Sequence, residues 1–110
     1  MANVYKNYKV DLTTNAETTL YTVPTQTTAI IRSIRICNDD PSNACTLTMK
    51  ITDSSSNSFS LEKDKSISAK TSDEILEAAL IATESEVIKA QDQNDNDLHI
   101  IISVLEISNA

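Results

Sequence analysis

The chain contains no glycine and no tryptophan in 110 residues, and it has a single histidine, His99. Phosphate-binding loops, nucleophile elbows and dinucleotide fingerprints depend on glycine, because their backbones adopt positive φ angles or approach a ligand closely. General acid–base catalysis most often uses histidine, and one histidine beside isoleucines is typical of a packing residue. The composition therefore predicts a protein that is not an enzyme and that binds no cofactor.

Basic residues are also scarce: 9 Lys and Arg stand against 16 Asp and Glu, for a net charge of −7. This balance argues against nucleic acid as a partner, because phosphates select lysine and arginine. No stretch approaches the roughly 20 apolar residues of a membrane span, and residues 1–6 lack the apolar core of a signal peptide. We expect no membrane contact, synthesis in a cytoplasm, and one domain over residues 1–110.

Alternation of apolar and polar residues with period two runs through most of the chain. It is clearest over residues 44–52, where Cys45, Leu47, Met49 and Ile51 alternate with threonines and a lysine. Residues 98–107 are apolar on both faces, which is typical of a central, covered strand. Strands are predicted over 4–12, 19–23, 28–38, 44–52, 57–62, 66–68, 86–91 and 98–107. The fold class is all-β: a single antiparallel β-sandwich of about eight strands, jelly-roll or immunoglobulin-like, with little or no helix.

Two features leave alternatives open. Residues 74–82 fit helical spacing as well as an extended chain, and their shortness favours the extended form. Cys37 and Cys45 flank residues 38–44; if that segment is a hairpin loop, a cross-strand disulfide is possible, whereas a reducing cytoplasm favours free thiols.

Metal sites find little support in the sequence. Residues 92–97 form an acidic run, but an EF-hand loop needs glycine at its sixth position and glutamate at its twelfth. Those places hold Asp97 and Ser103, so the run is predicted to be a turn, with a weak calcium site as the alternative. Two cysteines and a distant His99 are too few ligands for structural zinc. We therefore expect no metal.

Contacts with other subunits are predicted at the first strand. Residues 1–12 form a terminal edge strand or arm, with lysines that protect an edge against uncontrolled pairing. Edges are also where one subunit adds its strand to another, and a closed homo-oligomer such as a trimer or ring would use it this way; the alternative is an edge that faces water. Arg32 is predicted to share a face with Ile30, Ile34 and Ile36, with its stem along partly covered apolar surface or its charge paired at an interface. The candidate interface residues are Val4, Tyr5, Lys6, Tyr8, Lys9, Val10 and Arg32.

Four segments carry a resemblance: 17–24 (ETTLYTVP), 28–34 (TAIIRSI), 52–55 (TDSS) and 98–107 (LHIIISVLEI). Over residues 5–107 the chain resembles a family of small virion proteins from tailed phages of marine bacteria. In that family a glycine-bearing turn follows Val-Pro, whereas this chain has Thr25-Gln26-Thr27 at the same place.

The resemblance implies a structural role in the virion and carries no catalytic residues. The expected role is capsid decoration or cement, with the major capsid protein as partner. A tail, neck or fibre component is the alternative within the virion. A receptor- or carbohydrate-binding module is a further alternative, against which stands the lack of an aromatic residue near the acidic run at 92–97.

Overall fold

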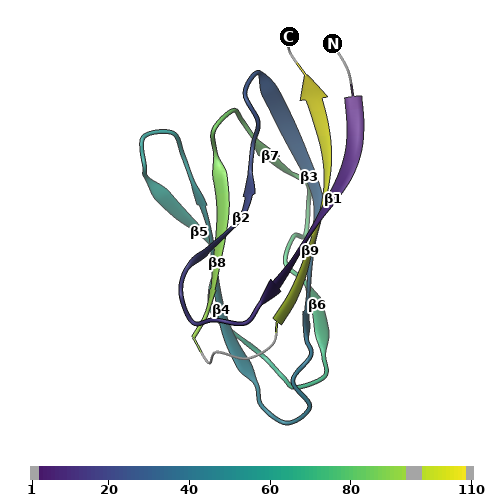
Figure 1. The fold of residues 1–110 in the computed structure, drawn as a ribbon, viewed down its shortest axis with the longest axis vertical. Helices are drawn as coiled ribbons and strands as arrows, with labels where there is room; N and C mark the ends of the chain where they lie inside the picture. The colour runs from purple at the N-terminus through teal and green to yellow at the C-terminus, as the bar shows by residue number, and fades with distance from the viewer. Residues whose placement is uncertain (1–2, 94–97, 109–110) are drawn as a thin grey trace.

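The computed structural model describes residues 3–93 and 98–108, which form nine strands and no helix. The strands make two antiparallel sheets that pack face to face, so the predicted β-sandwich is confirmed. The molecule measures 47 × 27 × 22 Å, and both termini lie at one end of the long axis (Figure 1). No helix of the described residues is long and apolar enough to cross a membrane.

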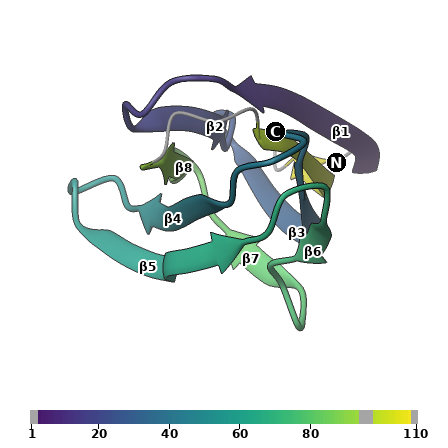
Figure 2. The same cartoon turned by 90° about the horizontal axis from the view of Figure 1, so that it is seen from below.

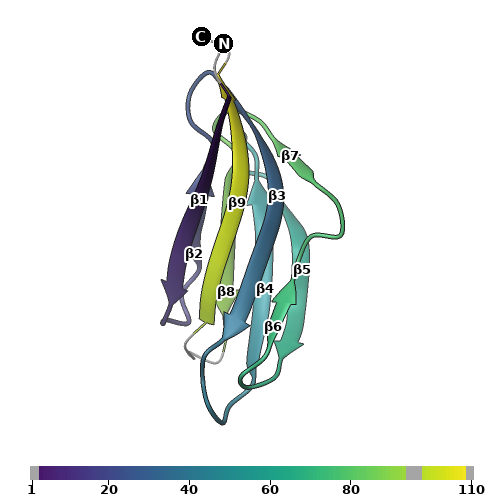
Figure 3. The ribbon, with the colours of Figure 1, turned by 90° about the vertical axis from the view of Figure 1, so that its right-hand side faces the viewer.

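The first sheet contains the ends of the chain. Its order is β1 (Asn3–Leu12), β9 (Leu98–Ser108), β3 (Thr27–Asn38) and β6 (Ser72–Glu74), and β7 (Leu80–Ala82) also pairs with β3. Figure 3 shows these strands side by side, with β1 at one edge and β6 and β7 at the other. The first strand therefore lies at the edge of a sheet, as its lysines predicted.

The second sheet has the order β2 (Thr18–Thr22), β8 (Val87–Asp92), β4 (Cys45–Thr52) and β5 (Ser58–Ile67). Figure 2 shows the two layers, with the chain crossing from one to the other at most connections. In an immunoglobulin sandwich several successive strands pair within one sheet. Here β4 and β5 are the one pair of strands that both follow each other in the chain and pair directly. The topology is therefore of the jelly-roll kind.

The core lies between the sheets, and β9 runs through the middle of one wall of it. The inward side chains of β9 are buried: Leu98, Ile100, Ile102, Val104 and Glu106. Ile101 on the opposite face is 41% exposed, so the prediction that this strand is covered on both faces is wrong. The outward apolar residues of β9 remain at the surface.

Strand β3 departs from the alternation predicted for residues 28–38. Ile31 pairs with Val104 and Ser33 pairs with Ser103, so Arg32 forms a bulge between them. The bulge inserts one residue and shifts which side chains face the core. The buried apolar residues of this stretch are Ala29, Ile31, Ile34 and Ile36. The prediction that Arg32 shares a face with Ile34 and Ile36 is therefore wrong.

Two further segments differ in detail from the prediction. The strands expected at 57–62 and 66–68 are one strand, β5, with register shifts against β4 and a positive φ of 53° at Asp64. Residues 74–82 are not helical: β6 and β7 lie on either side of a bent connection at 75–79. The extended alternative held, in two short pieces.

Turns are made without glycine by placing other residues in the left-handed region. Gln26, Ser56, Asp64, Lys70 and Ser85 have φ between 53° and 72°. Gln26 lies in the turn after Val23-Pro24. A side chain is thus held in a backbone conformation that costs about 1 kcal/mol or more outside glycine.

The two cysteines lie in different sheets, so the hairpin on which a cross-strand disulfide would depend does not form. Cys37 is half-buried near the end of β3, and Cys45 is buried at the start of β4. Both thiols are free, as the second alternative had it.

Candidate interaction face

An apolar row crosses the outer face of the first sheet. Tyr5 pairs with Leu105, Leu105 pairs with Ile30, and Ile30 pairs with Ile81, so four strands contribute one side chain each. Tyr5 is 74% exposed and Ile81 is 63% exposed, while the two residues between them are half-buried. Neighbours directly opposite on one face lie about 5 Å apart, so these side chains form a continuous stripe. We call Tyr5, Leu105, Ile30 and Ile81 the apolar row.

An open hollow of about 530 Å³ lies beside the row over β1, β9 and β3. Its lining residues are Tyr5, Lys6, Asn7, Arg32, Ser103 and Val104. Three of the predicted interface residues, Tyr5, Lys6 and Arg32, are therefore brought together from β1 and β3, which both pair with β9. We call it the arginine hollow.

The bulge of β3 explains why Arg32 reaches this hollow. Arg32 stands between inward Ile31 and outward Ser33, and it is exposed. Its guanidinium makes no hydrogen bond or ion pair with the described residues. An unpaired guanidinium next to apolar surface presents five donors to whatever covers the face.

A second hollow of about 310 Å³ lies farther along β1 and β9. It is lined by Lys9, Val10, Asp11, His99, Ile100 and Ile101. His99 Nε2 lies 3.5 Å from Asp11 and 4.0 Å from Asp39, so the histidine faces carboxylates at the surface instead of packing in the core. Lys9 and Val10 of the predicted interface lie at this end.

The remaining predicted interface residues differ in accessibility. Val4 is 45% exposed near the start of β1. Tyr8 is half-buried and points inward, with its ring 4.7 Å from that of Tyr21 between centroids and tilted by 46°. Tyr8 therefore joins the two sheets and is not a surface contact in this structure.

A buried carboxylate lies beneath this edge. Glu106 accepts hydrogen bonds from the hydroxyls of Tyr21 at 2.6 Å and Tyr8 at 3.1 Å, and its other oxygen lies 3.0 Å from Lys6 Nζ. The side chain of Glu106 is 8% exposed. The network thus ties the edge strand β1 to β9 and to β2 of the opposite sheet.

Ionisation in this network follows from its contacts. Burial alone raises the pKa of Glu106, but the hydrogen bonds from Tyr21, Lys6 and Tyr8 outweigh it, so the pKa lies below its usual value. Burial, and then the contact with Glu106, raises the pKa of Tyr21. The hydrogen bond to Glu106 raises the pKa of Lys6. A charged glutamate with two neutral tyrosines is the stable form at neutral pH.

Sequence reasoning missed Glu106 although a signal was present. Glu106 continues the set Leu98, Ile100, Ile102 and Val104 at every second position, so alternation alone places it inward. An inward carboxylate requires donors, and the tyrosines of the N-terminal half are suitable ones. Which of them reach it depends on the packing of the two sheets.

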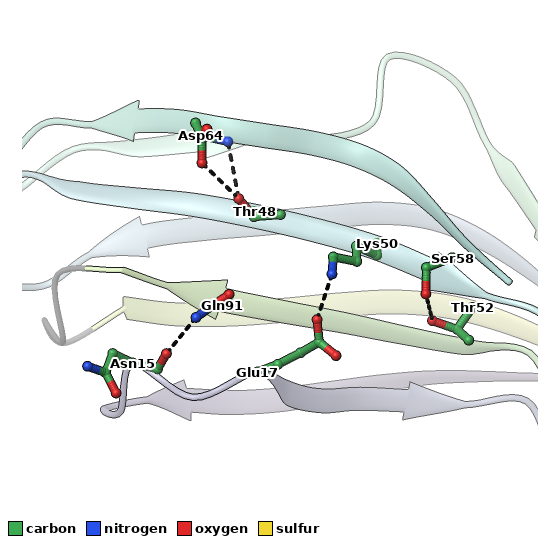
Figure 4. A network of polar contacts seen from close by, with 8 residues as sticks. All are labelled: Asn15, Glu17, Thr48, Lys50, Thr52, Ser58, Asp64 and Gln91. Atoms are coloured by element: carbon green, nitrogen blue, oxygen red, sulfur yellow. Dashed lines mark hydrogen bonds and ion pairs between the residues drawn. The ribbon is translucent and has the colours of Figure 1, made fainter. Parts of the chain in front are cut away.

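The outer face of the second sheet is polar and internally bonded, as Figure 4 shows. Lys50 pairs with Glu17 at 2.9 Å, and Asp64 bonds to Thr48 through its backbone NH and its carboxylate. Gln91 donates to the carbonyl of Asn15 at 2.8 Å. The threonine and lysine face predicted over residues 44–52 corresponds to this surface; Thr46, Thr48 and Lys50 are half-buried there and Thr52 is buried.

Metal ligands do not gather in the described residues. Within residues 3–93 and 98–108, no group of three or more His, Cys, Asp or Glu could hold a metal ion. Most of the acidic run at 92–97 lies outside the described residues. Asp92 itself is the last residue of β8 and is buried, so the turn does not include it.

Comparison with known proteins gives a match of fold. No family model and no curated protein matches this sequence. Among solved structures, a chain of the Bacillus endospore appendages, which form a family of disulfide-linked pili, superposes with a TM-score of 0.59 at 9% identity. The match covers 98% of this chain and 89% of that chain. At this identity the likeness establishes that the two chains share a fold.

Proposed function

We propose that this chain is a non-enzymatic structural subunit that works in an assembly of many copies. The observation that carries the proposal is the apolar row, with Tyr5 74% exposed and Ile81 63% exposed on one face of a small acidic domain. Contiguous exposed apolar surface with an arginine beside it is typical of protein–protein interfaces. The opposite face, which is polar and internally bonded, keeps the unassembled subunit soluble.

The similarity to a pilus chain supports the general part of this proposal. That protein comes from endospore appendages described as disulfide-linked pili, and the two chains share the fold over 98% of this chain and 89% of that chain. A two-layer sandwich offers two outer faces, which suits repeated contacts between copies.

The assembly we propose is a phage particle. Support comes from the resemblance of residues 5–107 to small virion proteins of tailed phages. In that setting the chain is made in the host cytoplasm and decorates the capsid, where it stabilises the shell by non-covalent contacts with the major capsid protein. A place in the tail or neck is the second location within the same particle.

Quantitative mass spectrometry of purified particles tests this function. We expect the chain to be present at a copy number comparable to that of the major capsid protein, because a decoration protein follows the symmetry of the shell. A copy number of only a few per particle indicates the tail or neck. Absence from purified particles, with the chain found free in the lysate, contradicts the virion assignment.

A further inference from the structure

Both arginines of the chain, Arg32 and Arg35, lie on the outward side of β3. Arg35 donates to Ser72 Oγ at 3.3 Å and lies near Glu74. Arg32, in the arginine hollow, has no such partner among the described residues. Arginine and tyrosine are the residues that most often anchor an interface, so Arg32 beside Tyr5 marks the place where a carboxylate would bind.

The carboxylates on the same face are already engaged. Glu74 bonds to Ser33 Oγ and accepts from the backbone NH groups of Ile34 and Leu76. Asp11 lies at the far end beside His99. In a two-fold contact this face would meet itself, and Arg32 would find no free carboxylate there. The complement of Arg32 must therefore come from another part of a partner's surface.

Three exposed or half-exposed carboxylates make no hydrogen bond or ion pair with the described residues: Glu62, Glu77 and Glu84. Glu62 is followed by Lys63, which repels an arginine, and Glu84 lies between Thr83 and Ser85. Glu77 differs, because Leu76, Ala78 and Ala79 surround it with apolar side chains. Glu77, Ala78 and Ala79 are exposed in the connection between β6 and β7.

This connection and the arginine hollow lie toward opposite edges of the first sheet, so one copy can present its connection to the hollow of the next copy. Residues 76–79 project at the β6–β7 edge of the first sheet (Figure 3). The hollow is lined by residues of β1, β9 and β3, so it lies toward the β1 edge of the same sheet. One edge thus carries an acid within an apolar segment, and the other carries an arginine beside a tyrosine and a leucine. The hollow, at about 530 Å³, is in the size range that receives several side chains.

We propose that residues 76–79 of one copy bind in the arginine hollow of a second copy, with Glu77 paired to Arg32. This inference rests on the proposed role as a self-assembling subunit and names its contact. The contact is head-to-tail, so each copy offers one hollow and one acidic segment. Repetition of such a contact gives a ring if the rotation closes and a filament if it does not.

The chemistry favours a second copy over an unrelated partner, because the chain itself supplies the matching acid. Arg32 is unpaired and the rest of the chain is strongly acidic, with a net charge of −7. The charge-assisted pair sets the register, and burial of Tyr5 and Leu105 under the exposed Ala78 and Ala79 supplies apolar contact.

A charge exchange tests the contact. Self-association of the full chain is measured by sedimentation velocity over a concentration series, for wild type, Arg32→Glu, Glu77→Arg and the double variant. We expect each single change to weaken association at least tenfold. We expect the double variant, and an equimolar mixture of the two single variants, to regain it, because opposite charges again face each other in every contact.

Lys63→Glu is the matched control: it changes an exposed cation of the second sheet by the same charge and is expected to leave association unchanged. Arg32 and Glu77 are exposed, and thermal unfolding verifies that each variant folds. Loss in the single variants without recovery in the mixture overturns the inference, as does an unchanged Arg32→Glu variant. A wild-type chain that stays monomeric at every concentration also overturns it, and the particle copy number then decides the proposed function independently.

Discussion

The two outer faces of this sandwich have similar backbones and opposite surface chemistry. On the second sheet, Lys50 and Thr48 point outward into a network of ion pairs and hydrogen bonds that the face supplies itself. On the first sheet, Tyr5, Leu105 and Ile30 point outward into a row that nothing in the described chain covers. A polar face gains little from burial because it exchanges water for similar bonds, whereas an apolar face gains about 25 cal/mol per Å². This difference is the reason we propose the outer face of the first sheet as the contact face.

The largest expected effect concerns the buried carboxylate under the first sheet. Glu106→Ala removes the acceptor of two tyrosine hydroxyls and one lysine, and it should lower the free energy of unfolding by about 3 kcal/mol. The matched change on the second sheet, Glu17→Ala, breaks a surface pair with Lys50 and should cost less than about 0.5 kcal/mol. Urea unfolding measures both. Equal losses would contradict the view that only the first network is structural.

The next effect concerns association. Tyr5→Ser removes the most exposed member of the apolar row and should weaken self-association about tenfold, or about 1.4 kcal/mol. Phe59→Ser is the control, because it removes a 60% exposed aromatic side chain from β5 of the other sheet. Sedimentation of both variants decides the matter. If Phe59→Ser weakens association as much as Tyr5→Ser, the two sheets do not differ as proposed.

A smaller effect is the dependence of stability on pH. Because the pKa of Glu106 in the folded chain lies below the ordinary 4.5, its contribution is present above that pH and is lost as the pH falls through the folded value. The pKa of Tyr21 is raised above 10.0, so the tyrosine's contribution is present below that pH and is lost as the pH rises through the folded value.

Urea titrations across this pH range measure the dependence. Glu106→Gln should reduce the slope of the unfolding free energy against pH on the acid side by up to one proton. If stability falls at acid pH as steeply in Glu106→Gln as in the wild type, Glu106 is not the source of that fall.

The smallest expected effect is a difference in reactivity between the two thiols, which does not involve a change in stability. Burial, with a contribution from Asp92, raises the pKa of Cys45 to about 11, whereas Cys37 is half-buried on the outer side of the first sheet. Near pH 8, iodoacetamide should therefore modify Cys37 alone in the folded chain and both residues in urea, as read by mass spectrometry. Cys37→Ser is the control and should remain unlabelled until it unfolds. Rapid native labelling of Cys45 would show that the second sheet opens.

Alternation predicted the strands well because the two-residue period depends only on local geometry and on which face is buried. It placed β4 and β9 almost at their observed bounds. It failed at Arg32, where a bulge inserts one residue and nothing in the local pattern marks the shift. It also divided β5 in two, because charges at 62–65 interrupt the apolar pattern on an edge strand that has little apolar surface to bury.

The candidate face was predicted in part. Charges and aromatics in the first strand indicated an edge with contact residues, and Tyr5, Lys6 and Arg32 do line one hollow. Tyr8 was included because it belongs to the same strand, yet its ring points inward to Tyr21. The sequence could not distinguish the inward-pointing Tyr8 from the residues that line the hollow. The contacts of each of these side chains are made with a strand of the other sheet or with the far end of the chain.

The sequence by itself determined an antiparallel all-β domain, the position of most strands, and an outer face of threonine and lysine on β4. These properties follow from side-chain period and turn chemistry, which act over a few residues. Tertiary structure alone decided the jelly-roll order, the free thiols, the Glu106 network, and the union of Tyr5, Leu105, Ile30 and Ile81 into one row. Each of these joins residues far apart in the chain, and register and sheet packing fix such pairs only once the whole core has formed.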